Sequence, residues 1–190
     1  MTNRTSGRGP VRNGAIGGVL LLLIGLLDGC SDRQTIELGS LFAFGDGHST
    51  VCIPALRDAT DVAFGFDALN NTGDSPLSIT HVELVDSVGL NVAGSYVVPL
   101  PPHDALIGVS AGWPLSASRT AEIPGWDLSK YTDGVVPAAN TSADVYNLLI
   151  HLQISAALPA TFSAMRIEYT YHDDSFYQNT AVGLRVAAEC

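Results

Sequence analysis

The sequence predicts an all-β fold in which two antiparallel sheets pack face to face, behind a short hydrophobic N-terminal leader. Apolar side chains recur at every second residue in several segments after residue 50, which is typical of half-buried strands. Turn-forming residues separate these segments, and no segment after residue 30 carries a long helical repeat with capping residues. About seven short strands with turns between them favour an antiparallel β-sandwich.

The first half of the predicted sandwich contains three strands. The first spans 62–68, and its inward residues are predicted to be Val62, Phe64, Phe66 and Ala68. A turn follows at 70–74, where the sequence is Asn-Asn-Thr-Gly-Asp. The second strand covers 77–85, and its alternation slips near His81, which predicts a bulge there. A shorter strand is predicted over 92–98.

The last third of the chain alternates most clearly. Three rows of apolar residues each fall on one face of a predicted strand: Tyr146, Leu148, Ile150, Leu152 and Ile154; Met165, Ile167, Tyr169 and Tyr171; and Val182, Leu184, Val186 and Ala188. Cys190, the last residue, has the same parity as the third row. Its thiol is therefore predicted to point toward the core.

Residues 99–144 form the least regular segment, which contains six prolines and both tryptophans. A short strand is predicted inside it at 119–123. Connections of this length are often functional or cover the edge of a sheet. Trp113, Trp126 and Tyr131 either offer a stacking surface for a sugar or peptide or pack over one end of the sandwich.

The chain has three cysteines, Cys30, Cys52 and Cys190. A Cys52–Cys190 disulfide would tie the first strand to the last, which is a use of cysteine typical of proteins outside the cytosol. Two unpaired buried thiols are the alternative. No Cys-x-x-Cys pair supports a zinc site or a thioredoxin-like redox site.

An apolar run from Ala15 to Leu27 follows three arginines and ends just before Gly29 and Cys30. A basic leader, a short apolar core and a small residue before the break form the layout of a secretory signal peptide. As a helix the run would rise about 20 Å, which is less than the roughly 30 Å hydrocarbon core of a bilayer. Leu27, Gly29 and Cys30 match three positions of the lipobox. The segment thus resembles a bacterial lipoprotein precursor that is cut before Cys30 and lipidated on that thiol.

This resemblance implies three parts: a signal peptide at 1–29, a flexible tether at 30–49 and a folded domain at 50–190. Asp28 departs from the lipobox, whose second position usually holds a small or neutral residue. A signal without lipid, whether cleaved or not, is therefore the alternative. A buried helix of a cytosolic protein is the third interpretation.

Two segments resemble Ig-like domains of bacterial envelope proteins. Residues 62–73 end in Asn-Asn-Thr-Gly and are soon followed by Pro-Leu-Ser-Ile at 76–79, and such domains have a strand-turn-strand of this kind. Residues 167–171, with an Asp-Asp turn close behind them, fit the last hairpin of such a domain. The resemblance implies an Ig-like β-sandwich. Because these domains serve adhesion, assembly and ligand binding, it assigns no single function.

Residues 108–112, Gly-Val-Ser-Ala-Gly, fit the G-x-S-x-G pattern of serine hydrolases. That chemistry needs Ser110 on a sharp turn between a strand and a helix, whereas Trp113-Pro114 and further prolines follow. Partner residues do occur in a suitable order, namely Asp127 or Asp144 and then His151 or His172. The alternation of strands and helices expected of a hydrolase is missing, so a serine hydrolase is the least favoured alternative.

The five histidines are dispersed, and no pair has the i, i+4 spacing of a helical zinc site. His151 shares a mixed face with Asn147 and Gln153, which predicts a solvated strand position. A cation at 172–174 is an alternative, although the segment lacks the oxygen-rich pattern of a calcium loop. The sequence therefore predicts neither a metal nor a cofactor.

The formal net charge is −10, and an acidic surface repels both nucleic-acid phosphates and anionic lipid headgroups. Nucleic acid is therefore not an expected partner, and attachment to a membrane would depend on the lipid at Cys30. The sequence favours a lipid-anchored, non-enzymatic module on the extracytoplasmic face of the cell membrane that binds an envelope protein or supports envelope assembly. A module that binds a glycan or small ligand through residues 99–144 is the alternative.

Overall fold

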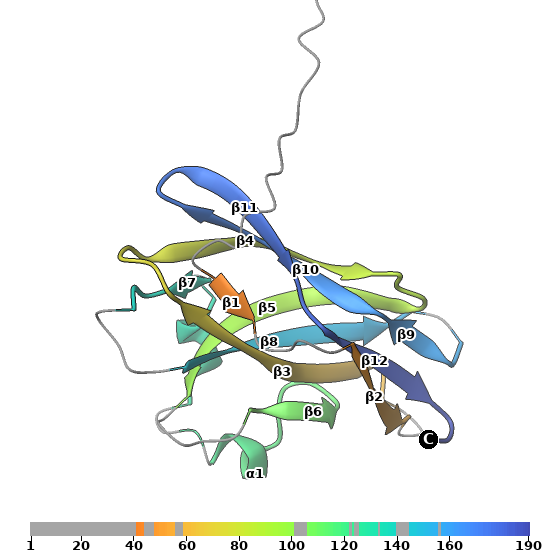
Figure 1. The fold of residues 1–190 in the computed structure, drawn as a ribbon. Coiled ribbons are helices and arrows are strands. Elements are labelled where there is room, and N and C mark those ends of the chain that lie inside the picture. The colour runs from red at the N-terminus through yellow and green to blue at the C-terminus, as the bar shows by residue number, and fades with distance from the viewer. Residues whose placement is uncertain are drawn as a thin grey trace, which may run out of the picture. The chain divides into compact units, whose positions relative to one another are not determined.

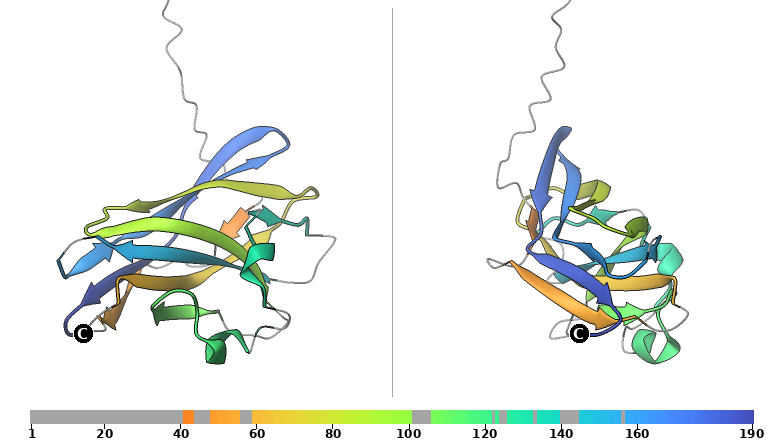
Figure 2. Two further views of the ribbon diagram at one scale, coloured as in Figure 1. Left: turned by 180° about the vertical axis from the view of Figure 1, so that it is seen from behind. Right: turned by 90° about the vertical axis from the view of Figure 1, so that its right-hand side faces the viewer.

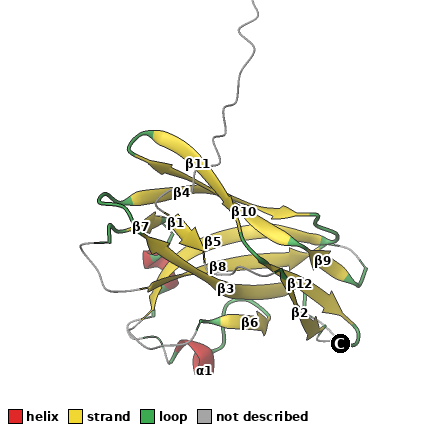
Figure 3. Ribbon diagram, in the orientation of Figure 1, coloured by secondary structure: helices red, strands yellow, loops and turns green. Residues whose placement is uncertain are grey.

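The computed structural model describes residues 41–43, 48–55, 59–100, 106–121, 123, 126–132, 134–139, 145–155 and 157–190. The predicted signal peptide and Cys30 lie outside the described residues. The described part belongs to one structural unit, Gln34–Cys190, and consists mostly of strands in antiparallel sheets, which confirms the all-β prediction (Figure 1, Figure 3). No helix in this part is long and apolar enough to cross a membrane.

The first sheet has the strand order β1-β3-β8-β5, and β6 pairs with β3 as well. Its strands are β1 (Leu41–Ala43), β3 (Asp61–Asn71), β5 (Leu90–Leu100), β6 (Gly108–Ala111) and β8 (Val145–Ile154). β6 pairs with the beginning of β3 and β1 with its end, both in antiparallel fashion. Because β1 lies within the predicted tether, the folded domain begins before residue 50.

The second layer combines two groups of strands. One group has the order β11-β10-β4-β7: β11 (Asp174–Asn179), β10 (Ala164–Tyr171), β4 (Leu77–Val85) and β7 (Val135–Val136). The other has the order β2-β12-β9: β2 (Ser49–Pro54), β12 (Val182–Ala187) and β9 (Ala160–Phe162). Only Ser163 separates β9 from β10, and two residues separate β11 from β12. β9 and β10 therefore form one nearly continuous run of chain, and β11 and β12 form another. These two runs pass from one group into the other, so the groups form one layer (Figure 2).

The main core lies between the two layers. The apolar rows predicted in the last third supply much of it, and these residues are all buried: Leu148, Ile150, Leu152, Met165, Ile167, Tyr169, Leu184 and Val186. Phe64 of β3 meets Phe162 of β9 edge to face with ring centroids 5.2 Å apart, which joins the layers directly. The period-two pattern therefore identified most of the core in this region, but the prediction for Ala188 is wrong, because β12 ends at Ala187 and Ala188 is exposed.

A bulge in β3 changes which residues face this core. Gly65 and Phe66 together oppose one residue of β8, so the alternation of β3 shifts by one position. After the bulge, Asp67 and Leu69 lie on the inner face. Ala68, which was predicted to face inward, lies on the outer face instead.

The bulge predicted near His81 is confirmed. Along β4, His81 and Ile79 pair with consecutive residues of β10, so Thr80 is the extra residue that stands between them without a partner across the ladder. The regular pairing of β4 with β10 is therefore interrupted at Thr80. On its other side, β10 pairs with β11.

The strand predicted at 119–123 is wrong, because the structure has the helix α1 (Ala117–Thr120) at its beginning. The hydroxyl of Thr120 donates to Ala117 O at 3.2 Å, and its backbone N–H donates to Ser116 O at 3.1 Å. These local hydrogen bonds compete with a strand, as serine and threonine often do. A single 3₁₀ turn, η1 (Leu128–Lys130), follows later in the same connection.

A disulfide joins Cys52 of β2 to Cys190, as predicted. The two cysteines are 138 positions apart in the sequence, and their Cα atoms lie 5.8 Å apart. Cys52 lies opposite Arg185 in the parallel pair of β2 and β12, so the bridge ties the residues that follow β12 back to β2. Cys190 is exposed, so the prediction that its thiol points into the core is wrong: β12 ends at Ala187, and its alternation does not reach the last residue.

Candidate functional site

In its described part, the connection between β5 and β8 lies over the outer face of the first sheet. It leaves β5 at one edge, pairs as β6 with β3, and returns to β5, where Tyr131 O accepts a hydrogen bond from Val97 N–H at 3.1 Å. A second set of apolar side chains, the outer-face cluster, is buried beneath it: Ala63, Val98, Leu100, Ile107, Leu115 and Leu149, with Tyr96, Leu106, Trp113, Ile123, Trp126, Leu128 and Tyr131 packed against them.

The three aromatic residues predicted as a ligand surface all belong to the outer-face cluster and are half-buried. The ring of Trp113 stacks on that of His151 with centroids 4.5 Å apart and planes within 7°. Tyr96 stacks on the same indole at 5.3 Å, whereas Trp126 and Tyr131 form a separate pair at 5.9 Å. These rings cover a sheet face, which corrects the prediction that they pack over one end of the sandwich.

Beneath Trp113, His151 pairs with Asp61. His151 Nε2 lies 2.7 Å from Asp61 Oδ1, and the hydroxyl of Thr60 donates to the other carboxylate oxygen at 2.6 Å. The hydrogen bond from Thr60, and then that from His151, lower the pKa of Asp61. Only 14% of the His151 side chain is exposed, so the predicted solvated position is wrong. The reason is that a distant part of the chain covers this face.

Ser110 lies inside β6 rather than on a turn. It pairs with Ala63 of β3, and its hydroxyl donates to Ala111 O at 3.4 Å. Ala63 pairs with His151 on its other side, so strand β3 separates the hydroxyl of Ser110 from the imidazole. The chain bends at Gly112, whose φ is +93°, and the next helix begins only at residue 117. The strand-turn-helix of a serine hydrolase is not formed here.

The other residues considered as partners of Ser110 have different neighbours. Asp127 caps η1 by accepting from the N–H and the hydroxyl of Ser129, at 3.2 and 2.7 Å, and these bonds lower the pKa of its carboxyl. His172 pairs with Asp74 at 3.1 Å. Asp144 lies outside the described residues. The described geometry therefore assembles no nucleophile, base and acid around Ser110.

The turn at 172–173 joins β10 to β11, and with Tyr171 and Asp74 it forms a small polar group. The hydroxyl of Tyr171 donates to Asp74 Oδ1 at 2.8 Å, and this bond, followed by that with His172, lowers the pKa of Asp74. His172 and Asp173 have positive φ values of 49° and 66°, as a two-residue hairpin turn requires. Within the described residues, no group of three or more His, Cys, Asp and Glu side chains could hold a metal ion.

Asp67 is a notable residue that the sequence pattern missed. The bulge in β3 turns it toward the main core, where it is fully buried, and neither carboxyl oxygen has a hydrogen-bond partner among the described residues. Burial raises its pKa from 3.8 to about 7. Gly65 was the available signal, because a glycine inside a strand pattern often marks a bulge.

The chain matches no protein-family model, and no curated protein matches it significantly.

Proposed function

We propose that this chain is an exported, lipid-anchored envelope protein whose Ig-like sandwich serves as a non-enzymatic binding or assembly module. The observation that carries the proposal is the Cys52–Cys190 disulfide. Structural disulfides persist in oxidising compartments outside the cytosol and are rare inside it. This agrees with the interpretation of residues 1–29 as a secretory signal and supports the proposed position of the domain on the extracytoplasmic face of the membrane.

The strand order supports the Ig-like part of the proposal. An Ig domain has one sheet with the order A-B-E-D and another that contains C-F-G. In chain order, β1, β3, β5 and β8 take the positions A, B, D and E, and they lie in the order β1-β3-β8-β5. β4 takes position C, the run β9–β10 takes F and the run β11–β12 takes G, because β10 pairs with β4 and β11 while β9 pairs with β12. β2 is an additional strand beside β12.

Lipidation at Cys30 can be tested directly. In a bacterial host fed an alkyne fatty acid, the full-length chain is expected to incorporate the label, because Cys30 would be the first residue after cleavage. Cys30→Ala is expected to abolish labelling. The label is read by click chemistry on the purified protein after denaturation.

The matched control is Cys190→Ala, which removes a different cysteine and should keep the label. Asp28→Ser should label at least as well as the natural chain, since it restores a small neutral residue to the lipobox. Failure of both the natural chain and Asp28→Ser to label would contradict the anchor.

The outer-face cluster supports a second candidate, a module that binds a glycan or small ligand through residues 99–144. Trp113, Trp126 and Tyr131 gather over one sheet face and are only half-buried, so each remains partly exposed to solvent, and aromatic rings can stack on sugars. Cell-wall glycans are then expected to change the tryptophan fluorescence in a saturable manner. Trp113→Ala and Trp126→Ala should weaken that binding, and unchanged affinity in both variants would contradict this candidate.

A further inference from the structure

β11 forms an open edge of its sheet. It pairs with β10 and with no other strand of the described part. The two-residue turn makes Tyr171 and Asp174 a hydrogen-bonded pair, so alternate residues along β11 direct their N–H and C=O groups away from β10. These outward residues are Ser175, Tyr177 and Asn179. The hairpin of β10 and β11 stands out from its sheet in more than one view (Figure 1, Figure 2).

β5 is also an edge strand, but its outward backbone groups are protected. Val97 N–H of β5 donates to Tyr131 O, and Pro99 has no N–H to offer. β11, in contrast, contains no proline, lysine or bulge, and no described residue outside its own hairpin makes a backbone hydrogen bond to its outward groups. Proteins usually blunt such edges, and an edge left open is a template for another strand.

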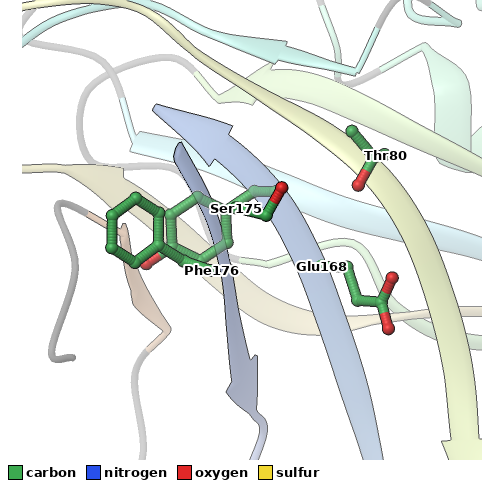
Figure 4. Close-up of a pocket in the computed structure, with 5 residues that line it drawn as sticks. Thr80, Glu168, Ser175 and Phe176 are labelled. Carbon is green, nitrogen blue, oxygen red and sulfur yellow. The ribbon is translucent and has the colours of Figure 1, made fainter. Parts of the chain in front are cut away.

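A hollow beside this edge contains an unpaired carboxylate. It has a volume of about 70 Å³ and is lined by Thr80, Glu168, Tyr169, Ser175 and Phe176 (Figure 4). Glu168 makes no ion pair with a described residue, whereas the neighbouring Arg166 is held by Glu83 at 3.0 Å. An added strand would lie about 5 Å beyond β11. A lysine or arginine of that strand placed opposite Ser175 could extend across it toward Glu168.

The charges around the hairpin favour a basic partner over a second copy of the chain. Asp173 and Asp174 lie at the turn, and Asp74 is hydrogen-bonded to Tyr171 at the same end. The whole chain carries a net charge of −10, so two copies repel each other at long range. A basic segment is attracted to the same surface.

We propose that β11 binds an extended, basic segment of a partner protein, which adds to the sheet as a further strand and places one basic side chain against Glu168. Backbone hydrogen bonds to Ser175, Tyr177 and Asn179 supply affinity, and Glu168 supplies selectivity. The inference rests on the proposed function, because it names the surface through which the binding or assembly module would act.

The probe is a short fluorescent peptide of alternating threonine and valine with one central lysine, titrated into the full-length protein at low salt and followed by anisotropy. Tyr177→Pro is expected to weaken binding at least about tenfold, since proline removes an outward N–H while leaving the β10 ladder intact. Tyr177→Val, which keeps that N–H, is the matched control and should bind. Glu168→Gln should weaken binding about tenfold, whereas Glu189→Gln, at the other end of the sheet, should not.

Two further measurements leave the protein itself unchanged. A peptide methylated on alternate backbone nitrogens should not bind, and a peptide with glutamate in place of lysine should bind more weakly. Absence of binding by the lysine peptide, or equal binding by Tyr177→Pro and Tyr177→Val, would overturn the inference. A dimer that Tyr177→Pro converts to a monomer would overturn it in favour of a second copy. If the chain is labelled at Cys30 but binds no peptide, the result contradicts this inference and leaves the proposed lipid anchor unaffected.

Discussion

Reduction of the Cys52–Cys190 disulfide is expected to lower the free energy of unfolding by about 2–5 kcal/mol. The bridge closes a sequence separation of 138 residues, so its loss frees a large part of the unfolded chain. It also holds β2, which forms an edge of its sheet and, among the described strands, pairs only with β12. The effect is measured by urea denaturation of the full-length protein with and without dithiothreitol.

A double variant, Cys52→Ala with Cys190→Ala, separates the bridge from other effects of the reductant. It should unfold at the same urea concentration as the reduced natural protein, and dithiothreitol should not change its midpoint. Equal midpoints for the oxidised and reduced natural protein would contradict a stabilising role for this disulfide.

Asp67→Asn is expected to stabilise the domain at pH 8, by up to about 4 kcal/mol in the free energy of unfolding. The fold raises the pKa of Asp67 from 3.8 to about 7, so it favours the protonated carboxyl. The unfolded chain releases this proton near pH 4. Stability of the natural protein therefore falls as pH rises from about 4 to 7, and the full penalty is present above pH 7. The amide has no charge to bury at any of these values.

The difference between variant and natural protein, followed by urea denaturation from pH 4 to pH 8, isolates this one group. It should be smallest at pH 4 and level off above pH 7. Asp74→Asn is the matched control, because the pKa of Asp74 is lowered rather than raised and its removal should bring no gain at pH 8. A constant difference across the range would show that Asp67 does not titrate between these values.

Much of the fold could be predicted from the sequence because strands with one buried face carry a period of two. Met165, Ile167 and Tyr169 of β10 show this, as they alternate with Arg166 and Glu168 and all lie in the core. The pairing of Cys52 with Cys190 was likewise predictable from their number and context. In contrast, β11 was not predicted, because Ser, Gln and Asn dominate an edge strand that needs little apolar surface.

The candidate site was harder to predict because it depends on contacts between distant parts of the chain. His151 shares its strand face with the polar residues Asn147 and Gln153, which predicts exposure to solvent. Trp113, which follows β6, stacks on its ring, and this contact cannot be seen in the local pattern. Asp67 looked like an outward residue because alternation was counted through Gly65 and Phe66, where the bulge resets it. Local patterns give the period of a strand, but the partner strand decides where that period is interrupted.

The disulfide also determines how tension would travel through the molecule. A force that enters from the N-terminal side along β2 reaches Cys52 and can cross through sulfur to Cys190, which follows β12. From there it runs back along β12 into β11, since two residues alone separate these strands. The long stretch of chain between the two cysteines is then largely bypassed. When the domain is pulled between its N-terminal side and β11, the force passes through the disulfide and β12. The strands of the sandwich core then carry little of it.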